Sequence, residues 1–367
     1  MNIVYHASDS FAKVTGTSIV SIFENNKDID KINVYVIEKN FTEDNKKKME
    51  QLADKYNRKI IFIPMPDINK SEHLHLKKIK EKWIFDSYCR LFLDKLLPEE
   101  VEKVLYLDGD VLNTGSLKEL WNLDMGESSA AAVIDCLGEK YYELLGLEKN
   151  ARYCNSGVIL FNLDKWRKDC MGDKVRKYVH DNNGYVFFME QTVFNAVMQG
   201  KIKILHPKYN TYSMMQTMSY EDLMKLRNVK RFYKKNEIEE AINNPILVHM
   251  TSSFWIVNRP WYKKTTHPMQ EEYKIYAELT PWDDPMEEDK RNYKKKIIDG
   301  IVQCMPKNIV IKLVSIIYNN SRVKKIQKEG RMVFLSVLLG VGVDYFIDYL
   351  FLPARRNKPM FGPFDNW

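Results

Sequence analysis

The feature that most constrains this chain is a short apolar run that ends in two aspartates. Residues 104–107 (Val-Leu-Tyr-Leu) are apolar without interruption, and Asp108, Gly109 and Asp110 follow directly. A continuous apolar run of this length, bounded by a turn signal, is typical of a strand buried on both faces of a parallel α/β sheet. Because ligands of open α/β sheets bind beyond the carboxyl ends of the strands, we expect the two aspartates to lie at a binding site.

The spacing of these two carboxylates indicates a metal site. Asp108 and Asp110 lie two residues apart, and carboxylates aimed at one point repel each other unless a hard cation lies between them. Mg²⁺ and Mn²⁺ accept such oxygen ligands and bridge them to a diphosphate. Gly109 lets the backbone turn and approach a bound group. Taken alone, the pattern also fits an ordinary acidic turn after a strand, because Asp and Gly are common turn residues.

Strands and helices alternate along the first part of the chain, which predicts an α/β fold with a mainly parallel central sheet flanked by helices. We expect strands at residues 2–7, 32–37, 60–63, 104–107, 130–134, 158–161 and 245–248. We expect helices around residues 19–23, 42–56, 85–97, 162–181 and 190–197. Thr42 is the predicted N-cap of the second helix.

Composition limits the class of protein. The 367 residues allow one large domain or two of ordinary size, and 45% hydrophobic residues exclude global disorder. The five cysteines form no Cys-x-x-Cys pair, which indicates small core residues in a reduced compartment. The first residues lead directly into a strand without a basic segment and a long apolar run, so we expect a cytoplasmic protein. The net charge of +7 gathers late in the chain without a recognised binding module, so we expect no nucleic-acid partner.

The last quarter of the sequence has a different character. Residues 287–330 mix Lys and Arg with apolar residues at helical spacing, and residues 332–352 are largely apolar but contain Asp344 and Asp348. The uninterrupted apolar part, 332–343, is too short to span a bilayer. Because basic residues flank it, we expect a helical anchor on an anionic membrane surface. The alternative is a helix that packs on the rest of the fold or forms a dimer interface, so a homodimer is a second possibility.

Further polar residues stand beside apolar runs, at the same predicted rim as the aspartates. They are Asp135, Asn155, Glu190 and His249. Together with the aspartates, they make the sequence resemble the retaining glycosyltransferases of family 8, the group of the bacterial lipooligosaccharide α-galactosyltransferases and glycogenin. The resemblance implies a GT-A nucleotide-diphospho-sugar transferase domain over residues 1–270, followed by a helical region over residues 271–367.

Ordered segments carry this resemblance, and together they are far more specific than any one of them. They are residues 87–90, 104–110, 120–124, 155–163, 190–195, 248–252 and 259–261. The family's pattern makes Asp108, Asp110 and His249 the ligands of a metal ion on the donor diphosphate. The resemblance implies Mn²⁺, with Mg²⁺ as the alternative.

The resemblance also implies the donor and catalytic residues. Expected donor contacts are Ala7, Ser8, Ser10, Phe11, Arg90, Asp108, Gly109, Asp110, Asp135, Asn155, Ser156, Ser252 and Arg259. Gln191, with Glu190 beside it, falls at the catalytic centre, where it stabilises a developing cation or acts as a nucleophile. The sequence departs from the family at Ser8, where an acid is usual, and at Ser252, where glycine is usual. Arg259 replaces a lysine and follows an insertion at 253–258.

The implied activity is metal-dependent, retaining transfer of a hexose from UDP-galactose or UDP-glucose. The acceptor is a glycan or a lipid-linked oligosaccharide in cell-surface polysaccharide synthesis, and the enzyme is cytoplasmic or peripheral on the inner face of the membrane. The metal neutralises charge on the leaving diphosphate, and Arg259 and Lys263 are expected to add to this effect. Because an amide is a poor nucleophile, same-face attack by the acceptor is favoured over a covalent intermediate.

Two alternatives remain. A sugar nucleotidyltransferase would need a Gly-rich, basic loop near the N-terminus for a triphosphate, and residues 8–13 do not supply one. A non-catalytic scaffold that binds a nucleotide or a glycan would be expected to have lost metal ligands, and all three are intact.

Overall fold

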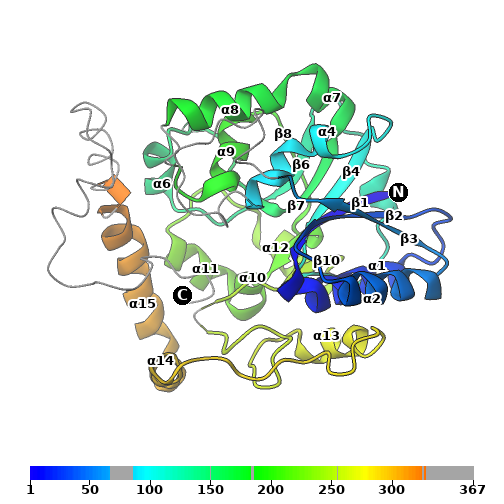
Figure 1. Ribbon diagram of the computed structural model, residues 1–367. Helices are drawn as coiled ribbons and strands as arrows, with labels where there is room; N and C mark the ends of the chain where they lie inside the picture. Colours follow the sequence, from blue (N-terminus) through cyan, green and yellow to red (C-terminus); the bar gives the residue numbers. More distant parts are fainter. Residues whose placement is uncertain (67–85, 149, 183–185, 254, 325, 328–367) are drawn as a thin grey trace, which may run out of the picture.

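A seven-stranded sheet forms the centre of the protein (Figure 1), with the strand order β3-β2-β1-β4-β7-β6-β8. The computed structural model describes the chain apart from residues 67–85, 149, 183–185, 254, 325 and 328–367. The strands are β1 (Asn2–Ser8), β2 (Asn33–Lys39), β3 (Lys59–Pro64), β4 (Lys103–Asp108), β6 (Ala130–Ile134), β7 (Cys154–Asn162) and β8 (Ile202–Ile204). All are parallel except β7, which lies antiparallel between β4 and β6. The mainly parallel sheet is confirmed.

Three further strands form a second, separate sheet with the strand order β5-β10-β9. Its strands are β5 (Val111–Asn113), β9 (Thr211–Tyr212) and β10 (Leu247–His249). Strand β10 is antiparallel to β5 and parallel to β9. Because β5 follows β4 after the Asp108–Asp110 turn, the second sheet continues directly from the carboxyl edge of the first.

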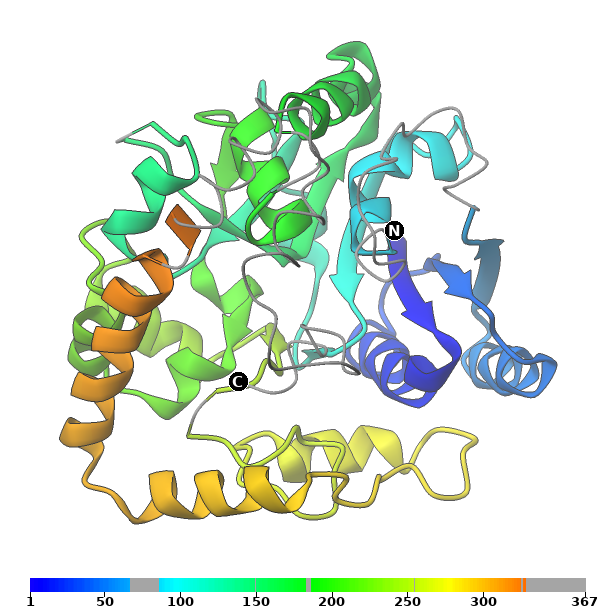
Figure 2. The same cartoon turned by 60° about the vertical axis from the view of Figure 1, so that its left-hand side comes forward.

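Helices cover both faces of the large sheet, as Figures 1 and 2 show. The α-helices are α1 (Ala12–Asn25), α2 (Glu43–Lys55), α4 (Leu93–Leu96), α5 (Lys118–Trp121), α6 (Glu139–Leu144), α7 (Leu163–Lys168), α8 (Met171–Asp181), α9 (Met189–Val197), α10 (Ser213–Thr217), α11 (Tyr220–Arg227), α12 (Lys235–Asn243), α13 (Gln270–Ala277), α14 (Tyr293–Cys304) and α15 (Lys307–Ile316). Shorter helical turns are η1 (Asp9–Phe11), η2 (Cys89–Phe92), η3 (Pro207–Tyr209) and the π-helical η4 (Ile317–Arg322).

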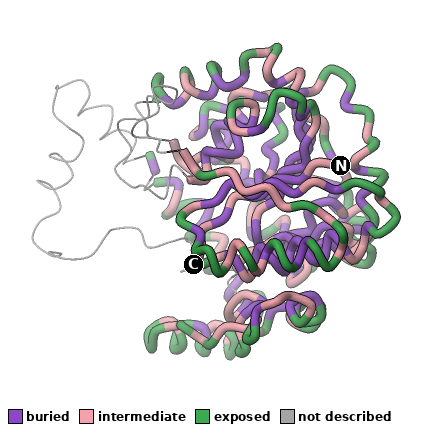
Figure 3. The backbone as a smooth tube through the Cα atoms, turned by 45° about the vertical axis from the view of Figure 1, so that its right-hand side comes forward, coloured by how far each residue is buried: buried purple, intermediate pink, exposed green. Residues whose placement is uncertain are grey.

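The strand periodicity divides the core between the two faces. Successive side chains of a strand point to opposite faces, so Tyr5 packs with α1 and α2 whereas Val4 packs with α7, α8 and α9. In β4, Leu105 and Leu107 join the first layer, and Tyr106 joins the second. Buried backbone is concentrated in these strands, and the outer helices carry most of the exposed residues (Figure 3). The apolar run in β4 is unbroken because helices cover both faces of the sheet.

Two predicted helices are interrupted in the structure. The helix expected over 162–181 divides into α7 and α8 at Cys170, whose φ of 51° lies in the left-handed region. The break lets each helix turn its own apolar face to the same core, with Trp166 buried in α7 and Val175 in α8. In the region expected as a helix over 85–97, the described part contains the 3₁₀ turn η2 before α4, and all four residues of η2 are buried.

One further local prediction is confirmed and another is corrected. Thr42 caps α2, since its Oγ1 accepts a hydrogen bond from the Asn45 backbone N–H at 3.3 Å. Asn155, Ser156 and Gly157 lie inside β7 rather than before it, so this strand starts earlier than the apolar run does. The apolar pattern predicts too short a strand, because Asn155 and Ser156 near the start of β7 are polar residues of the site.

The chain after residue 270 packs on the same body. Helix α13 lies against α1, and Trp282 donates from its indole Nε1 to Asn45 Oδ1 at 2.9 Å. Helices α14 and α15 run along the side away from β1–β3 (Figure 2). The predicted anchor at 332–352 lies outside the described residues. Within the residues that the structure describes, no helix is both long enough and apolar enough to cross a bilayer.

Candidate active site

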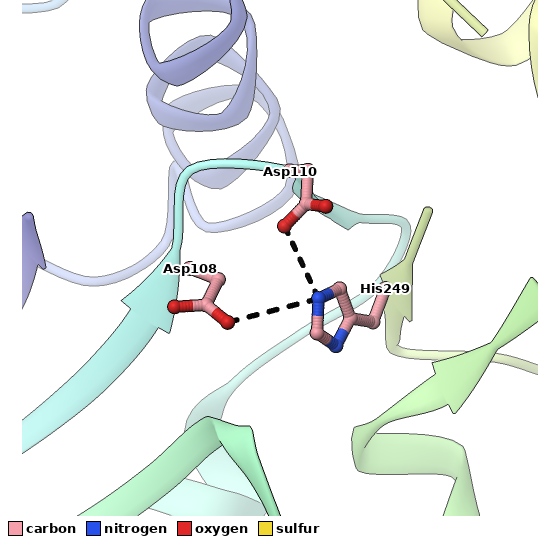
Figure 4. Close-up of side chains that lie close together, drawn as sticks. All are labelled: Asp108, Asp110 and His249. Carbon is pink, nitrogen blue, oxygen red and sulfur yellow. Dashed lines mark ion pairs between the residues drawn. The ribbon is translucent and has the colours of Figure 1, made fainter. Parts of the chain in front are cut away.

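Three predicted metal ligands meet where the two sheets join (Figure 4). Asp108 ends β4 and Asp110 immediately precedes β5. Strand β10 pairs with β5 so that His249 lies opposite Val111, and the Met250 N–H donates to the Asp110 carbonyl at 3.0 Å. The pairing of β5 with β10, rather than closeness in sequence, therefore brings the histidine to the aspartates.

The geometry of this triad fits a divalent cation. His249 Nε2 lies 3.1 Å from Asp110 Oδ1 and 3.7 Å from Asp108 Oδ2. One ligand atom from each of the three residues lies within 4.8 Å of the others. Two carboxylates with one imidazole form a donor set that suits Mn²⁺. The triad could therefore hold the predicted metal.

Neighbouring charges shift the pKa values of His249 and Asp110 in opposite directions. Burial alone would lower the pKa of His249, but Asp110 and Asp108 outweigh burial and raise it. Burial would raise the pKa of Asp110, yet His249 and Arg259 hold it well below its usual range. Arg259 donates from Nη1 to Asp110 Oδ2 at 2.7 Å and also to the carbonyl of Met250. The second oxygen of Asp110 is thus occupied by a cationic side chain, and its Oδ1 faces the histidine.

Gly157 makes room for the histidine ring. A Cβ atom at Gly157 would lie 2.2 Å from His249 Cε1, 2.5 Å from its Nδ1 and 3.0 Å from Asp108 Oδ2. Real Cβ contacts are never this short, so no larger residue fits while the ring keeps its place. Gly157 is a site residue beyond those predicted from the sequence, although it lies within the 155–163 segment that resembles the family.

Gly109 is required for a reason other than the predicted one. A Cβ atom there would lie 2.6 Å from Thr15 Oγ1 and 3.0 Å from the ring of Phe11. The backbone angle φ of Gly109 is not positive, so a residue with a side chain could also adopt the conformation of this turn. Gly109 instead lets the Asp-x-Asp turn pack closely against η1 and α1.

Arg90 connects the metal site to the predicted catalytic residues. Arg90 is only 6% exposed, and its Nη2 lies 2.9 Å from Asp108 Oδ1 and 3.7 Å from Glu190 Oε1. Nη1 donates to the Ser156 carbonyl at 2.8 Å, and the guanidinium lies 4.6 Å from the ring centroid of Tyr106. Because Arg90 occupies Oδ1 of Asp108, the other oxygen is left for the triad.

Gln191 lies within a network of polar side chains at the sheet edge. Its Oε1 accepts from the Ser156 N–H at 3.1 Å, and its Nε2 donates to Asp135 Oδ2 at 2.9 Å. Asn155 Nδ2 lies 3.4 Å from the same Asp135 oxygen. Because β7 is antiparallel, its first residues lie at the edge where β4 and β6 end. Asn155 and Asp135 therefore meet although they come from opposite strand ends.

Glu190 faces the other way. It is 7% exposed and accepts a hydrogen bond from Ser87 Oγ at 2.6 Å. Together with its contact to Arg90, this makes Glu190 a partner of the arginine rather than of Gln191. The two residues before it, Phe188 and Met189, both have left-handed backbone angles (φ 59° and 48°). Such strain in residues with side chains is uncommon and is characteristic of functional sites.

The residues expected to bind the nucleotide lie beside the triad. Ala7 and Ser8 end β1, whose His6 pairs with Asp108 of β4. Ser8 Oγ lies 3.1 Å from Ser10 Oγ, and Phe11 packs edge-on against Trp261 at 5.6 Å between ring centroids. The structure therefore brings this loop to the same rim.

The segment after His249 is only partly as expected. Arg259 reaches the triad, whereas Lys263 pairs with Glu288 at 2.7 Å and with Asp284 at 3.3 Å. The expectation that Lys263 assists the diphosphate is therefore not supported, because two nearby acids hold its ammonium group. Ser252 lies in the same loop and is half-buried.

The order of the large sheet, with β7 as its one antiparallel strand, and the Asp-Asp-His group at its edge agree with the expected GT-A fold, which solved structures share. Residues 2–265 match the family model described as Glycosyl transferase family 8, and the chain belongs to that family. It is therefore a glycosyltransferase.

Curated relatives agree with this family. The chain is 27% identical over 289 residues to general stress protein A of Bacillus subtilis, covering 77% of this chain and 94% of that protein. It is 27% identical over 309 residues to lipopolysaccharide 1,2-glucosyltransferase of Escherichia coli K12, covering 83% and 86%. Among solved structures, the galactosyltransferase LgtC in complex with donor and acceptor sugar analogues matches with a TM-score of 0.61 at 22% identity, covering 81% of this chain and all of that one. At that identity, the match supports the GT-A fold alone.

Proposed function

We propose that this protein is a metal-dependent, retaining hexosyltransferase that uses UDP-galactose or UDP-glucose as donor. The observation that carries the proposal is the intact triad of Asp108, Asp110 and His249 beside Arg259. The donor sugar and the metal are inferred from the family and from the chemistry of these ligands. Lipopolysaccharide 1,2-glucosyltransferase, one of the relatives, is named for glucosyl transfer and supports a hexose.

The main requirement of this reaction is stabilisation of the negative charge that develops on the leaving diphosphate. A bound Mn²⁺ or Mg²⁺ would supply Lewis-acid stabilisation of that charge. Asp108, Asp110 and His249 would hold the cation, and Arg259 would lie next to it as an additional positive group. The guanidinium fork suits a diphosphate oxygen pair. These fixed groups offer stabilisation without rearrangement during the reaction.

Gln191 and Arg90 would position the sugar end of the donor. The Gln191 amide is fixed at both ends, by the Ser156 N–H and by Asp135. An amide held in this way presents a dipole to a developing cation, but it is a poor nucleophile. We therefore favour same-face attack by the acceptor hydroxyl. Glu190 would act by holding Arg90 rather than by attacking the sugar, because its carboxylate already accepts from Ser87.

The acceptor is proposed to be a glycan or a lipid-linked oligosaccharide, met at the cytoplasmic face of a membrane. Large apolar side chains are exposed on α14 and α15, among them Tyr293, Ile297, Ile298, Ile301, Ile309, Leu313 and Ile316. Exposed Lys294, Lys296 and Lys312 lie between them. Helices with this mixture bind anionic interfaces. Sedimentation with phosphatidylglycerol vesicles, compared between wild type and Ile298→Ser, tests this surface, and gel filtration tests the alternative of a dimer.

The experiment that tests the activity is UDP release from a panel of UDP-sugars. Such enzymes hydrolyse their donor slowly without an acceptor, so wild type with Mn²⁺ should cleave one UDP-sugar. EDTA and Asp110→Ala should each abolish cleavage. If no UDP-sugar is cleaved and none binds in calorimetry, the transferase proposal is refuted, and a binding scaffold becomes the better description. A sugar nucleotidyltransferase would instead release diphosphate from UTP.

A further inference from the structure

Two arginines at the far side of the site form no ion pair within the described part of the chain, although one of them, Arg227, interacts electrostatically with Asp135. They are Arg227, at the end of α11, and Arg322, at the end of η4. The nearest hydrogen-bond acceptor of Arg227 is the thioether of Met214 at 3.0 Å, a weak acceptor, and its Nε is buried without a partner. The contacts of Arg322 are with aromatic rings, Phe188 at 5.0 Å and Phe187 at 5.5 Å from its guanidinium.

Both guanidinium groups lie over one tyrosine. Arg227 is 4.1 Å and Arg322 is 6.0 Å from the ring centroid of Tyr318. Burial lowers the pKa of Arg322, and the nearby charge of Arg227 lowers it further. Two half-buried cations that repel each other are costly unless anions compensate them, and of the two only Arg227 has the charge of Asp135 among its electrostatic interactions. Other arginines of the site, Arg90 and Arg259, are each paired with an aspartate.

The pair lies next to two chain segments of the active site, those that carry Asp135 and Gln191. A Cβ atom at Gly138, three residues after Asp135, would lie 2.5 Å from the Arg227 carbonyl and 3.3 Å from the Tyr318 ring. Phe188, which Arg322 contacts, lies three residues before Gln191. The cationic pair therefore borders the two segments that carry Asp135 and Gln191, beyond β6 and away from the nucleotide loop at β1.

We propose that Arg227 and Arg322 form a subsite for an anionic group carried by the acceptor, a phosphate or a carboxylate. The inference rests on the proposed transferase function and specifies its acceptor class. Planar guanidinium groups bind such oxygens through paired hydrogen bonds. The aromatic rings of Tyr318, Phe187 and Phe188 limit water around the pair and strengthen the attraction. The anion belongs either to a charged sugar or to the diphosphate of a lipid carrier.

Calorimetry with defined probes tests the subsite. The protein, saturated with UDP and Mg²⁺ to fill the donor site, is titrated with glucose 6-phosphate, with farnesyl diphosphate and with glucose. We expect one anionic probe to bind at least about tenfold more tightly than glucose. Tighter binding of glucose 6-phosphate indicates a charged sugar, and tighter binding of farnesyl diphosphate indicates a lipid carrier. Arg322→Gln should remove most of this preference, and Arg322→Lys should keep part of it.

The control is Arg176→Gln, which removes one positive charge from α8, where the arginine is paired with Asp173. This variant should keep the preference for the anion. Equal or absent binding of all three probes to wild type, or unchanged binding by Arg322→Gln, would overturn the inference. Donor hydrolysis by the same samples separates the two proposals: hydrolysis without an anion preference refutes only the subsite. An anion preference without hydrolysis leaves the subsite standing and refutes the transfer chemistry.

Discussion

Substituting alanine for Gly157 should disable the metal site while leaving the fold intact. The added Cβ would lie 2.2 Å from His249 Cε1 and 2.5 Å from Nδ1. Carbon atoms in contact prefer separations of about 3.5–4.0 Å, so the ring must move by more than about 1 Å. A shift of that size would take Nε2 out of reach of an ion held by Asp108 and Asp110. We expect Mn²⁺ affinity to fall by about 10–100-fold, the range seen when residues that support metal ligands are changed.

The assay is calorimetric Mn²⁺ binding in the presence of UDP, together with UDP-sugar hydrolysis. Gly172→Ala in α8 is the matched control, because a Cβ there meets its nearest neighbour at an ordinary 3.7 Å. Inserting a methyl group into a packed site typically costs about 1–3 kcal/mol, so a folded but less stable Gly157→Ala protein with weakened metal binding is the expected result.

A double-mutant cycle makes the reasoning sharper. If Gly157 acts through the ring, Gly157→Ala should have almost no further effect on metal affinity in a His249→Ala background. Additive losses would mean that the glycine acts by another route. Binding of Mn²⁺ by Gly157→Ala within about twofold of wild type would refute the steric argument altogether.

Three further predictions follow from contacts of the site. Arg90→Met leaves half-buried Asp108 and buried Glu190 without their cation and should cost about 3–5 kcal/mol in urea unfolding; an unchanged midpoint would contradict this. Arg259→Gln should lower kcat/KM for donor hydrolysis at least about tenfold, and Lys263→Gln by less than about twofold, because only the first side chain reaches the triad. Burial lowers the pKa of His267 to about 3, so the folded protein holds it neutral. Because the unfolded chain binds that proton below about pH 6.5, stability from this group is present above that pH and is lost towards pH 3, by roughly 5 kcal/mol at most. Acid titration of the unfolding free energy should be less steep for His267→Gln, and parallel curves for the two proteins would show that this assignment is wrong.

Much of the fold and part of the site could be predicted from the sequence. The apolar run before Asp108 is sufficient to indicate a strand covered on both faces, since no half-exposed strand would be apolar throughout. The capping role of Thr42 is also local, because it depends on residues three positions apart. Helix ends such as Cys170 could not be predicted, because the break depends on which core the two halves share.

The sequence by itself determined the alternation of strands and helices, the Asp-x-Asp turn and the residues available for chemistry, since these depend on local pattern. Only the tertiary structure decided which of them meet. His249 reaches the aspartates because β10 pairs with β5, more than 130 residues earlier in the chain. Gly157 must stay small because the ring of His249, from the other sheet, packs against it. Lys263 pairs with Asp284 and Glu288, which follow it by 21 and 25 residues. Such long-range contacts are set by packing, and no local periodicity encodes them.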